Sequence, residues 1–258
     1  MKLNSLKSGL FLILLSGISL SSCNSNDELS AGMTANLVNV DNEGTTLISS
    51  DGLKTATTGT DAITGSLSDW LKFMREEEKL AHDLYIAFSE LYTVPVFNNI
   101  PRAELNHMNA VLTILTTYSI EDPASTENGV FNNADLQALY NTLLAKGKVS
   151  LVEALKVGAL VEETDILDLA KVYELNPGGD LTALTEALML GSRNHLRAFA
   201  RVLKVNGVVY TPVALSFDDY TAIVTSDWER GTGLCIGNQN CAGRKYCNRS
   251  GKGFMGGK

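Results

Sequence analysis

The sequence predicts an all-α fold, a four-helix bundle with one extra short helix. Of its 258 residues, 45% are hydrophobic and 19% are charged, which is ordinary for a globular protein. Four long segments carry apolar residues at helical spacing, and no run alternates apolar and polar residues well enough to indicate a sheet. Amphipathic helices of about 18 to 26 residues must bury their apolar faces against one another, which favours a bundle.

Residues 1–22 have the pattern of a secretion signal. Two lysines precede an apolar run from Leu10 to Leu20, too short for a helix to span a bilayer, which takes about 20 residues. The run ends in Leu-Ser-Ser-Cys, which resembles the lipobox of bacterial lipoproteins and implies a lipid on Cys23. That resemblance implies an exported protein anchored to a bacterial membrane, and Asn24 favours the outer membrane. An ordinary signal peptide with an incidental Cys23 is the alternative.

Residues 23–66 are expected to form a flexible, disordered tether. The segment is rich in Ser, Thr, Asn, Gly and Asp, and its apolar pieces are short, such as Leu47-Ile48. Such a composition buries too little apolar surface to offset the entropy lost on ordering. The tether would hold a helical domain, residues 67–229, away from the membrane.

Serine and proline residues mark the first two long helices. Ser66 or Ser68 can cap a first helix that ends near residue 92. Pro95 and Pro101 then bracket a break in the chain. A second helix is expected from Pro101, a residue suited to a first helical turn, to about residue 118.

Capping residues and stop signals define the remaining helices. Residues 134–146 are expected to form the extra short helix. Ser150 and Glu153 make an S-x-x-E capping box at the start of a third long helix. The sequence Asn-Pro-Gly-Gly at 176–179 ends that helix, and Asp180 caps the fourth.

Metal-ligand residue types interrupt the apolar face of each long helix. Glu78 lies on the first helix, Glu104 and His107 on the second, Glu162 on the third and His195 on the fourth. Burying an isolated carboxylate is costly, so each needs a cation partner, which a metal ion supplies. The i, i+3 spacing of Glu104 and His107 places both groups on one helix face, where both can reach one ion. The pattern predicts a metal site inside the bundle.

Several motifs together carry a family resemblance. Glu78, Ala81 and Tyr85 have the spacing of the first helix of ferritins, bacterioferritins and rubrerythrins, and Glu104-x-x-His107 matches their second helix. Three longer segments are REEEKLA at 75–81, GALVEE at 158–163 and GSRNHLRAF at 191–199. Over about 67–228 the chain resembles the ferritin-like superfamily, and more closely the bacterial family called domain of unknown function 2202. The resemblance implies iron, one or two ions, with manganese or zinc as the other candidates.

Ser192 departs from the ferritin-like pattern. The fourth helix of such a centre carries Glu at this place, so a second ion would lose a bridging ligand. Glu163 or Asp165 could compensate, Asp165 being one turn beyond Glu162. Otherwise the site holds one ion, or two with unequal affinity.

Simpler roles are the alternatives for the charged residues. Glu77 belongs to a charge run that would normally be solvated, and His82 is expected on the outer helix surface. A metal-free network of buried salt bridges would instead pair Glu162 or Glu78 with arginines of the fourth helix: Arg193, Arg197 and Arg201.

Residues 230–258 form a basic tail rich in glycine and cysteine. No acid follows Glu229, although the whole chain has a net charge of -8. Cys235, Cys241 and Cys247 are evenly spaced, and in an exported chain a disulfide between two of them is expected, with zinc binding as the alternative. The acidic balance of the chain argues against nucleic-acid binding.

Two classes of function follow from these features. The first is an exported, lipid-anchored protein that binds iron or a similar ion in its bundle. If that protein is an enzyme, the resemblance implies oxidation of ferrous iron or reduction of oxygen or peroxide. The second is a non-catalytic, metal-free binding or scaffold module at the cell surface. Metal sequestration by the cysteine tail is a third hypothesis.

Overall fold

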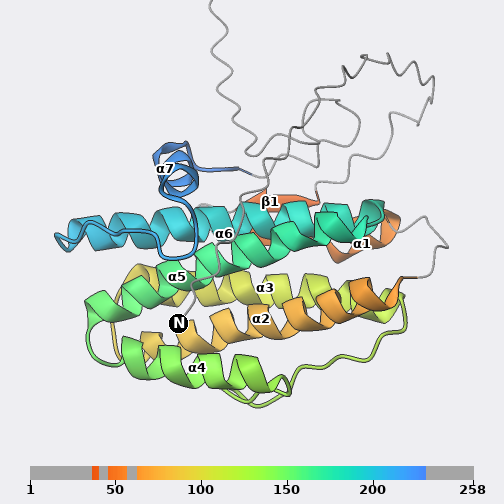
Figure 1. The fold of residues 1–258 in the computed structure, drawn as a ribbon, viewed down its shortest axis with the longest axis horizontal. Helices are drawn as coiled ribbons and strands as arrows, with labels where there is room; N and C mark the ends of the chain where they lie inside the picture. Colours follow the sequence, from red (N-terminus) through yellow and green to blue (C-terminus); the bar gives the residue numbers. More distant parts are fainter. Residues whose placement is uncertain (1–36, 41–45, 57–62, 231–258) are drawn as a thin grey trace, which may run out of the picture. The chain divides into compact units, whose positions relative to one another are not determined.

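The structure is a computed structural model that describes residues 37–40, 46–56 and 63–230. The expected signal segment, Cys23 and the three tail cysteines lie outside the described residues. The described part is mainly helical, as the sequence predicts (Figure 1). None of its helices is long and apolar enough to cross a bilayer.

Four long helices pack against one another. They are α2 (Gly65–Ser89), α3 (Pro95–Thr117), α5 (Leu151–Ala170) and α6 (Gly179–Val205). The closest pairs are α2 with α3 and α5 with α6; α2 also packs on α5, and α3 on α6. Figure 1 shows α2 and α3 beneath α5 and α6, so each long helix can present one face to a shared interior.

Side-chain caps begin α5 and the extra short helix, and the cap predicted at Ser150 is confirmed. The Ser150 side chain accepts from the backbone N–H of Glu153 at 3.2 Å and begins α5. The extra helix α4 (Ala134–Gly147) begins at Asn133, whose side chain accepts from two backbone N–H groups. A short 3₁₀ helix, η1 (Lys171–Leu175), continues α5 until Asn176, whose left-handed backbone ends it.

Two expected helix caps, those of α2 and α6, are wrong by a few residues. The Thr64 side chain, not Ser66 or Ser68, caps α2 by accepting from the backbone N–H of Leu67. The α6 helix starts after Gly178, so Asp180 lies inside its first turn.

The expected break between Pro95 and Pro101 is also wrong. Pro95 occupies the first turn of α3, where a missing N–H costs nothing, and Pro101 lies within the same helix. Pro101 removes one backbone hydrogen bond, and its buried position allows neighbouring helices to hold the turn.

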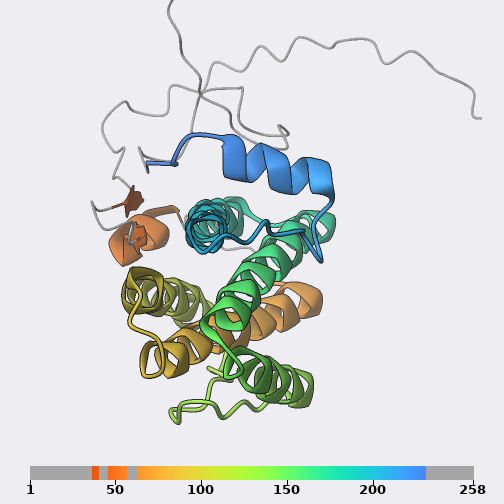
Figure 2. The same ribbon diagram turned by 90° about the vertical axis from the view of Figure 1, so that its left-hand side faces the viewer.

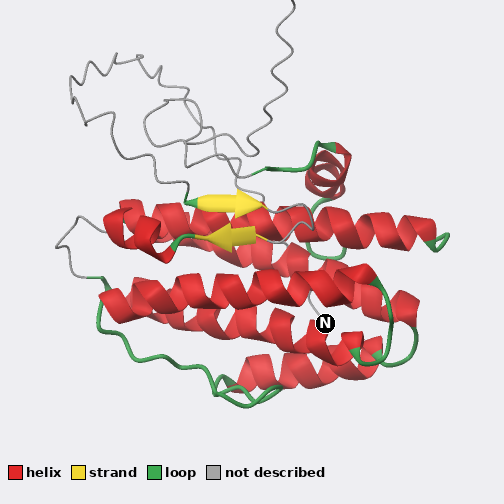
Figure 3. Ribbon diagram, turned by 180° about the vertical axis from the view of Figure 1, so that it is seen from behind, coloured by secondary structure: helices red, strands yellow, loops and turns green. Residues whose placement is uncertain are grey.

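The segment expected to be a tether contains ordered elements. Strands β1 (Val38–Val40) and β2 (Thr46–Ile48) pair antiparallel, and α1 (Ser50–Ala56) follows; Figure 3 shows the strands in yellow. The expectations of no sheet and of a structureless 23–66 segment are therefore wrong for these described residues. Strands of three residues are too short to show an alternating pattern. They are held by tertiary burial, because β2 and α1 pack on α3.

A further helix, α7 (Phe217–Thr225), was not expected from the sequence. The Ser216 side chain caps it, and the helix packs on α6, as Figure 2 shows. With nine residues it is shorter than the length, about 10 to 12 residues or more, over which an apolar pattern identifies a helix.

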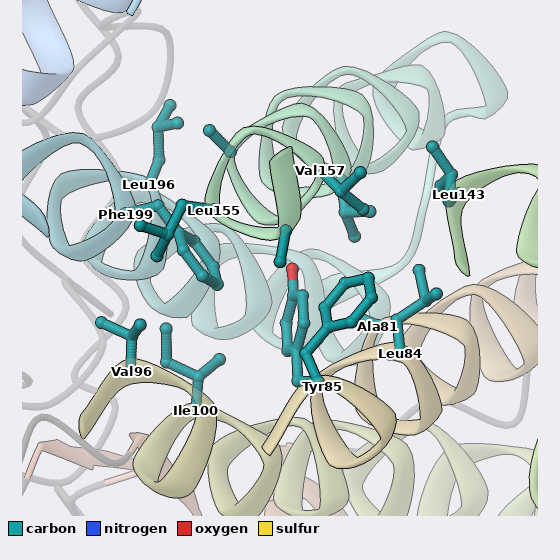
Figure 4. Close-up of a cluster of buried hydrophobic side chains, with 14 of the residues drawn as sticks. Ala81, Leu84, Tyr85, Val96, Ile100, Leu143, Leu155, Val157, Leu196 and Phe199 are labelled. Carbon is teal, nitrogen blue, oxygen red and sulfur yellow. The ribbon is translucent and has the colours of Figure 1, made fainter. Parts of the chain in front are cut away.

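The apolar core forms two separate clusters. One gathers around Tyr85, Phe97 and Phe199, whose rings contact one another, and Figure 4 shows part of it. The other gathers around residues from the opposite ends of the same helices, such as Met74 and Leu184. Each long helix contributes apolar residues to both clusters. The residues in the middle of each helix lie between the two clusters.

Candidate metal centre

A buried polar layer lies between the two apolar clusters. Every long helix crosses it, and the five ligand-type residues expected from the sequence all lie within it. Each has at most 2% of its surface exposed: Glu78, Glu104, His107, Glu162 and His195. The sequence prediction that these side chains share one interior is confirmed.

The five side chains form two overlapping groups around Glu104. Glu78, Glu104 and His107 make one group, and Glu104, Glu162 and His195 make the other. In each group, one ligand atom from every residue lies within 4.8 Å of the others. Glu104 belongs to both groups, so its two oxygens can serve two neighbouring positions.

The distances around Glu104 are short. His107 Nδ1 lies 2.9 Å from Glu104 Oε2 and 3.2 Å from Glu78 Oε2. His195 Nδ1 lies 2.9 Å from Glu104 Oε1 and 3.4 Å from Glu162 Oε2. The two imidazole rings stack with centroids 5.4 Å apart. Three carboxylates and two imidazoles therefore converge from four helices.

Several atoms of the layer have no hydrogen-bond partner within the described residues. They include Glu78 Oε1, Glu104 Oε1, His107 Nε2 and both ring nitrogens of His195. The contact of His195 Nδ1 with Glu104 Oε1 is short, but it lacks hydrogen-bonding geometry. Buried polar atoms are almost always satisfied, so this cluster is suited to a group that accepts lone pairs from both oxygen and nitrogen. A divalent metal ion fits that donor set.

The alternative of an arginine network is wrong for Arg193 and Arg197. Both guanidinium groups bind the Glu229 carboxylate, at 2.8 Å in each case, on the side of α6 that faces the residues around α7. Within the described residues, the cationic partners of Glu78, Glu104 and Glu162 are His107 and His195. Among the described residues, no lysine or arginine therefore pairs with these three carboxylates.

The charges of the layer shift its pKa values in opposite directions. Burial opposes the ionisation of Glu104, but the charges of His195 and His107 hold its pKa well below the ordinary value. Burial, with the charge of Glu104, raises the pKa of Glu162 to about 7. Burial opposes protonation of His195, but the charges of Glu104 and Glu162 raise its pKa to about 10. Without a metal ion, protons on the histidines balance the carboxylates.

Tyr85 holds one carboxylate of the layer in place. Its hydroxyl donates to Glu162 Oε1 at 2.6 Å and lies 3.4 Å from the carbonyl oxygen of Gly158. Figure 4 shows the hydroxyl pointing from α2 toward α5. Since the ring packs against Phe97 and Phe199, the position of the Glu162 carboxylate is fixed by the apolar core.

Gly191 is a residue of the centre that the sequence did not single out for this purpose. A methyl group at this position would lie 2.4 Å from Cε1 of His107, so only glycine leaves room for the imidazole. The same point is 3.3 Å from Thr46 Oγ1, a buried hydroxyl without a hydrogen-bond partner in the described residues. Strand β2 therefore lies beside Gly191, next to the His107 ring, which the polar composition of its segment could not indicate.

Ser192 and Asp165 meet at the edge of the layer. Ser192 Oγ donates to Asp165 Oδ2 at 2.5 Å, while Asp165 Oδ1 has no partner within the described residues. Burial raises the pKa of Asp165 well above its ordinary value, and the charges of Glu78, Glu162 and Glu104 add to the effect. Ser192 thus holds a carboxylate beside the polar layer.

Glu163 points away from the layer and has a structural role. One of its oxygens accepts from three consecutive backbone N–H groups, those of residues 213–215, at 2.7 to 2.9 Å. The other accepts from the Tyr210 hydroxyl at 2.6 Å. Because these donors use both oxygens, the suggested role of Glu163 as a compensating ligand is not supported by its position.

The charge run of α2 is buried, contrary to the expectation of a solvated face. Glu76 accepts from the backbone N–H groups of Asn132 and Asn133, and so fixes the loop before α4. Glu77 is 5% exposed and its Oε2 has no hydrogen-bond partner within the described residues. His82 bonds to Asp83 rather than to Glu78.

The fold and the site together define a helical protein with a buried carboxylate–histidine cluster. Residues 68–227 match the family described as an uncharacterized protein domain, DUF2202, and the chain belongs to that family. The family prediction made from the three segments is therefore confirmed.

Two comparisons with relatives agree with this assignment. The chain is 45% identical over 159 residues to uncharacterized protein MJ0754 of Methanocaldococcus jannaschii; the match covers 61% of this chain and 86% of the relative. It is also similar to the crystal structure of hypothetical protein MJ0754 from Methanococcus jannaschii, with a TM-score of 0.65 and 41% identity over 67% of this chain and 99% of that chain. The helical fold is thus shared with a solved structure.

Proposed function

We propose that this protein is a ferritin-like metal-binding protein that holds one or two divalent ions, iron foremost, in the polar layer. The ligands are Glu78, Glu104, His107, Glu162 and His195. The observation that carries the proposal is the set of buried, unpartnered oxygen and nitrogen atoms at the meeting point of four helices. No side chain of the described residues donates hydrogen bonds to these oxygens and nitrogens, whereas one metal ion in each group could bind both atom types.

The donor set indicates which ions are suitable. Mixed carboxylate and imidazole ligands suit iron, manganese and zinc, whereas thiolates would favour softer ions. Glu104 would bridge two ions or hold one, and Asp165, next to Ser192, offers the nearest additional carboxylate. Iron bound in this layer would supply one-electron chemistry, such as oxidation of the ferrous ion or reduction of oxygen or peroxide.

The protein's own residues fix the geometry of this centre. Tyr85 orients the Glu162 carboxylate, and Gly191 leaves room for the His107 ring. The two apolar clusters exclude water from both sides of the layer. Groups that hold ligands in this way usually change metal affinity about 10- to 100-fold when they are removed.

The shared ligand gives the most direct test. Elemental analysis of the purified full-length chain should find one or two ions, and anaerobic titration with Fe²⁺ should saturate at the same number. Glu104→Gln should weaken binding by more than about 100-fold, because it alters both groups, and removing an outer residue alone can cost that much. Glu186→Gln is the control, since this half-buried α6 carboxylate lies outside both ligand groups and bonds to Tyr173.

A chain that takes up no ion under any of these conditions would contradict the proposal. With the same folded structure, it would instead support the metal-free binding or scaffold module.

A further inference from the structure

Three further carboxylates continue the polar layer toward the protein surface. They are Asp165 and Asp168 on α5 and Glu77 on α2, and they are 6%, 8% and 5% exposed. None of them belongs to the two groups around Glu104. Glu77 interacts with Asp168 and Asp165. Asp165 interacts in turn with Glu78 and Glu104, so these acids form a row that adjoins the centre.

Unpartnered oxygens mark this row as incomplete. Glu77 Oε2 and Asp165 Oδ1 are buried and have no hydrogen-bond donor within the described residues. The carboxyl group of Glu77 lies within hydrogen-bonding reach of that of Asp168 and feels the charge of Asp165. Buried carboxylate oxygens are almost always satisfied, so Glu77 Oε2 and Asp165 Oδ1 are suited to a cation from outside the chain.

The row reaches solvent beside Lys171. The Lys171 ammonium binds Asp168 Oδ1 one turn along the chain, and this lysine side chain is 66% exposed. The indole N–H of Trp70 donates to the backbone carbonyl of Asp168 at 3.2 Å, which fixes the end of α5 against α2. The outermost carboxylate of the row is therefore held in place while its charge faces a displaceable surface cation.

We propose that Glu77 and Asp168, with Asp165 behind them, form an uptake path that passes divalent cations from the surface at Lys171 to the metal centre. The proposal rests on the proposed function, because the path leads to that centre. A divalent cation would displace the Lys171 ammonium from Asp168 and bind between Asp168 and Glu77. It would then be transferred past Asp165, whose neighbours include Glu78 and Glu104.

Rates of metal uptake distinguish this path from a purely structural role. Metal-free full-length protein is mixed with Co²⁺ in a stopped-flow instrument, and the visible absorption of Co²⁺ bound by histidine is followed. Glu77→Gln and Asp168→Asn should slow the filling of the centre at least about tenfold, since an acidic path raises association rates by about 10- to 1000-fold. The final absorption should stay unchanged.

Lys171→Ala should have the opposite effect. Removing the competing ammonium exposes Asp168, so filling should become faster, and this exposed position carries little risk of misfolding. Glu174→Gln is the matched control: it removes a carboxylate from η1, at the same surface but outside the row, and should leave the rate unchanged.

The outcomes separate the two proposals. Normal final absorption with unchanged rates in Glu77→Gln and Lys171→Ala would overturn the uptake path and leave the metal centre intact. Absence of any Co²⁺ absorption that depends on Glu104 in the natural protein would overturn the centre, and the path with it.

Discussion

Glu162 and Glu163 are neighbours on α5, both are buried, and the fold treats them in opposite ways. Glu163 receives four hydrogen bonds, three from backbone N–H groups and one from Tyr210, and so fixes the loop before α7. Glu162 receives one from Tyr85 and otherwise faces His195 and the Glu104 carboxylate. Hydrogen-bond donors of the chain thus occupy both oxygens of Glu163, whereas carboxylates of the polar layer keep oxygens without a donor.

The same contrast recurs on α2. Glu76 accepts from two backbone N–H groups, whereas Glu77 and Glu78 each keep an oxygen without a partner within the described residues. Structural carboxylates are bound by donors from loops, whereas those of the layer face other ligand atoms. The difference supports the proposal that the acids of the layer bind an ion that is not part of the chain.

The largest effect expected from this comparison is on stability. Glu163→Ala should lower the free energy of unfolding by about 3 to 5 kcal/mol, because it removes the acceptor of three backbone N–H groups, that of the buried Leu215 among them, and of the Tyr210 hydroxyl. Glu162→Ala should cost the metal-free protein much less, since Tyr85 keeps the Gly158 carbonyl within reach and repulsion with Glu104 is relieved. Urea unfolding of both variants without metal measures the difference.

Metal retention should show the reverse order. Glu162→Ala should lose metal, and Glu163→Ala, where it remains folded, should keep it. Equal losses of stability in the two variants would contradict the assignment of a structural role to Glu163 but not to Glu162.

Helical periodicity was enough to predict the four helices that build the layer, although only α5 begins at the residue that the sequence indicated. Ser150 begins α5 as its capping box indicates, and the spacing of Glu104 and His107 places both on the inner face of α3. Each of these signals is local, so each can be interpreted without knowing what packs against it.

What the sequence did not reveal depends on contacts between distant segments. Glu163 and Glu162 are adjacent and chemically identical, and only the position of the 213–215 backbone distinguishes them. Thr46 lies beside Gly191, next to the His107 ring, and belongs to a segment whose composition indicates a tether. The position of Glu77 on its helix does not reveal that Asp165 and Asp168 lie next to it, because this proximity depends on how α2 packs on α5.

The next largest effect is expected on the pH dependence of metal affinity. The metal-free centre holds protons on its histidines, and the pKa of His195 is about 10, so a metal ion must displace them. Affinity should therefore rise with pH between about 6 and 8, about tenfold per pH unit for each proton displaced. Competition titrations at several pH values measure the slope.

Stability of the metal-free protein should respond in the opposite sense. The raised pKa of His195 contributes stability that is complete below its unfolded value of about 6.5 and is lost as pH rises through about 10. His82→Ala is the control, because this histidine bonds to Asp83 outside the layer. A metal affinity that is independent of pH would show that His107 and His195 are not ligands.

The smallest expected effect concerns the hydroxyl that orients Glu162. Tyr85→Phe keeps the ring against Phe97 and Phe199 and removes one hydrogen bond to a carboxylate. The free energy of unfolding should therefore fall by about 1 to 2 kcal/mol. Metal affinity should fall about tenfold, since Glu162 is then free to turn. Calorimetric titration with metal measures the second effect.

Tyr118→Phe separates these two consequences. The Tyr118 hydroxyl also donates to a carboxylate at 2.6 Å, that of Asp180, at the start of α6 and away from the two ligand groups. Its removal should cost a similar amount of stability and leave metal affinity unchanged. If both tyrosine variants bind metal like the natural protein, Tyr85 only fills the core, and the position of Glu162 depends on His195 and the ion alone.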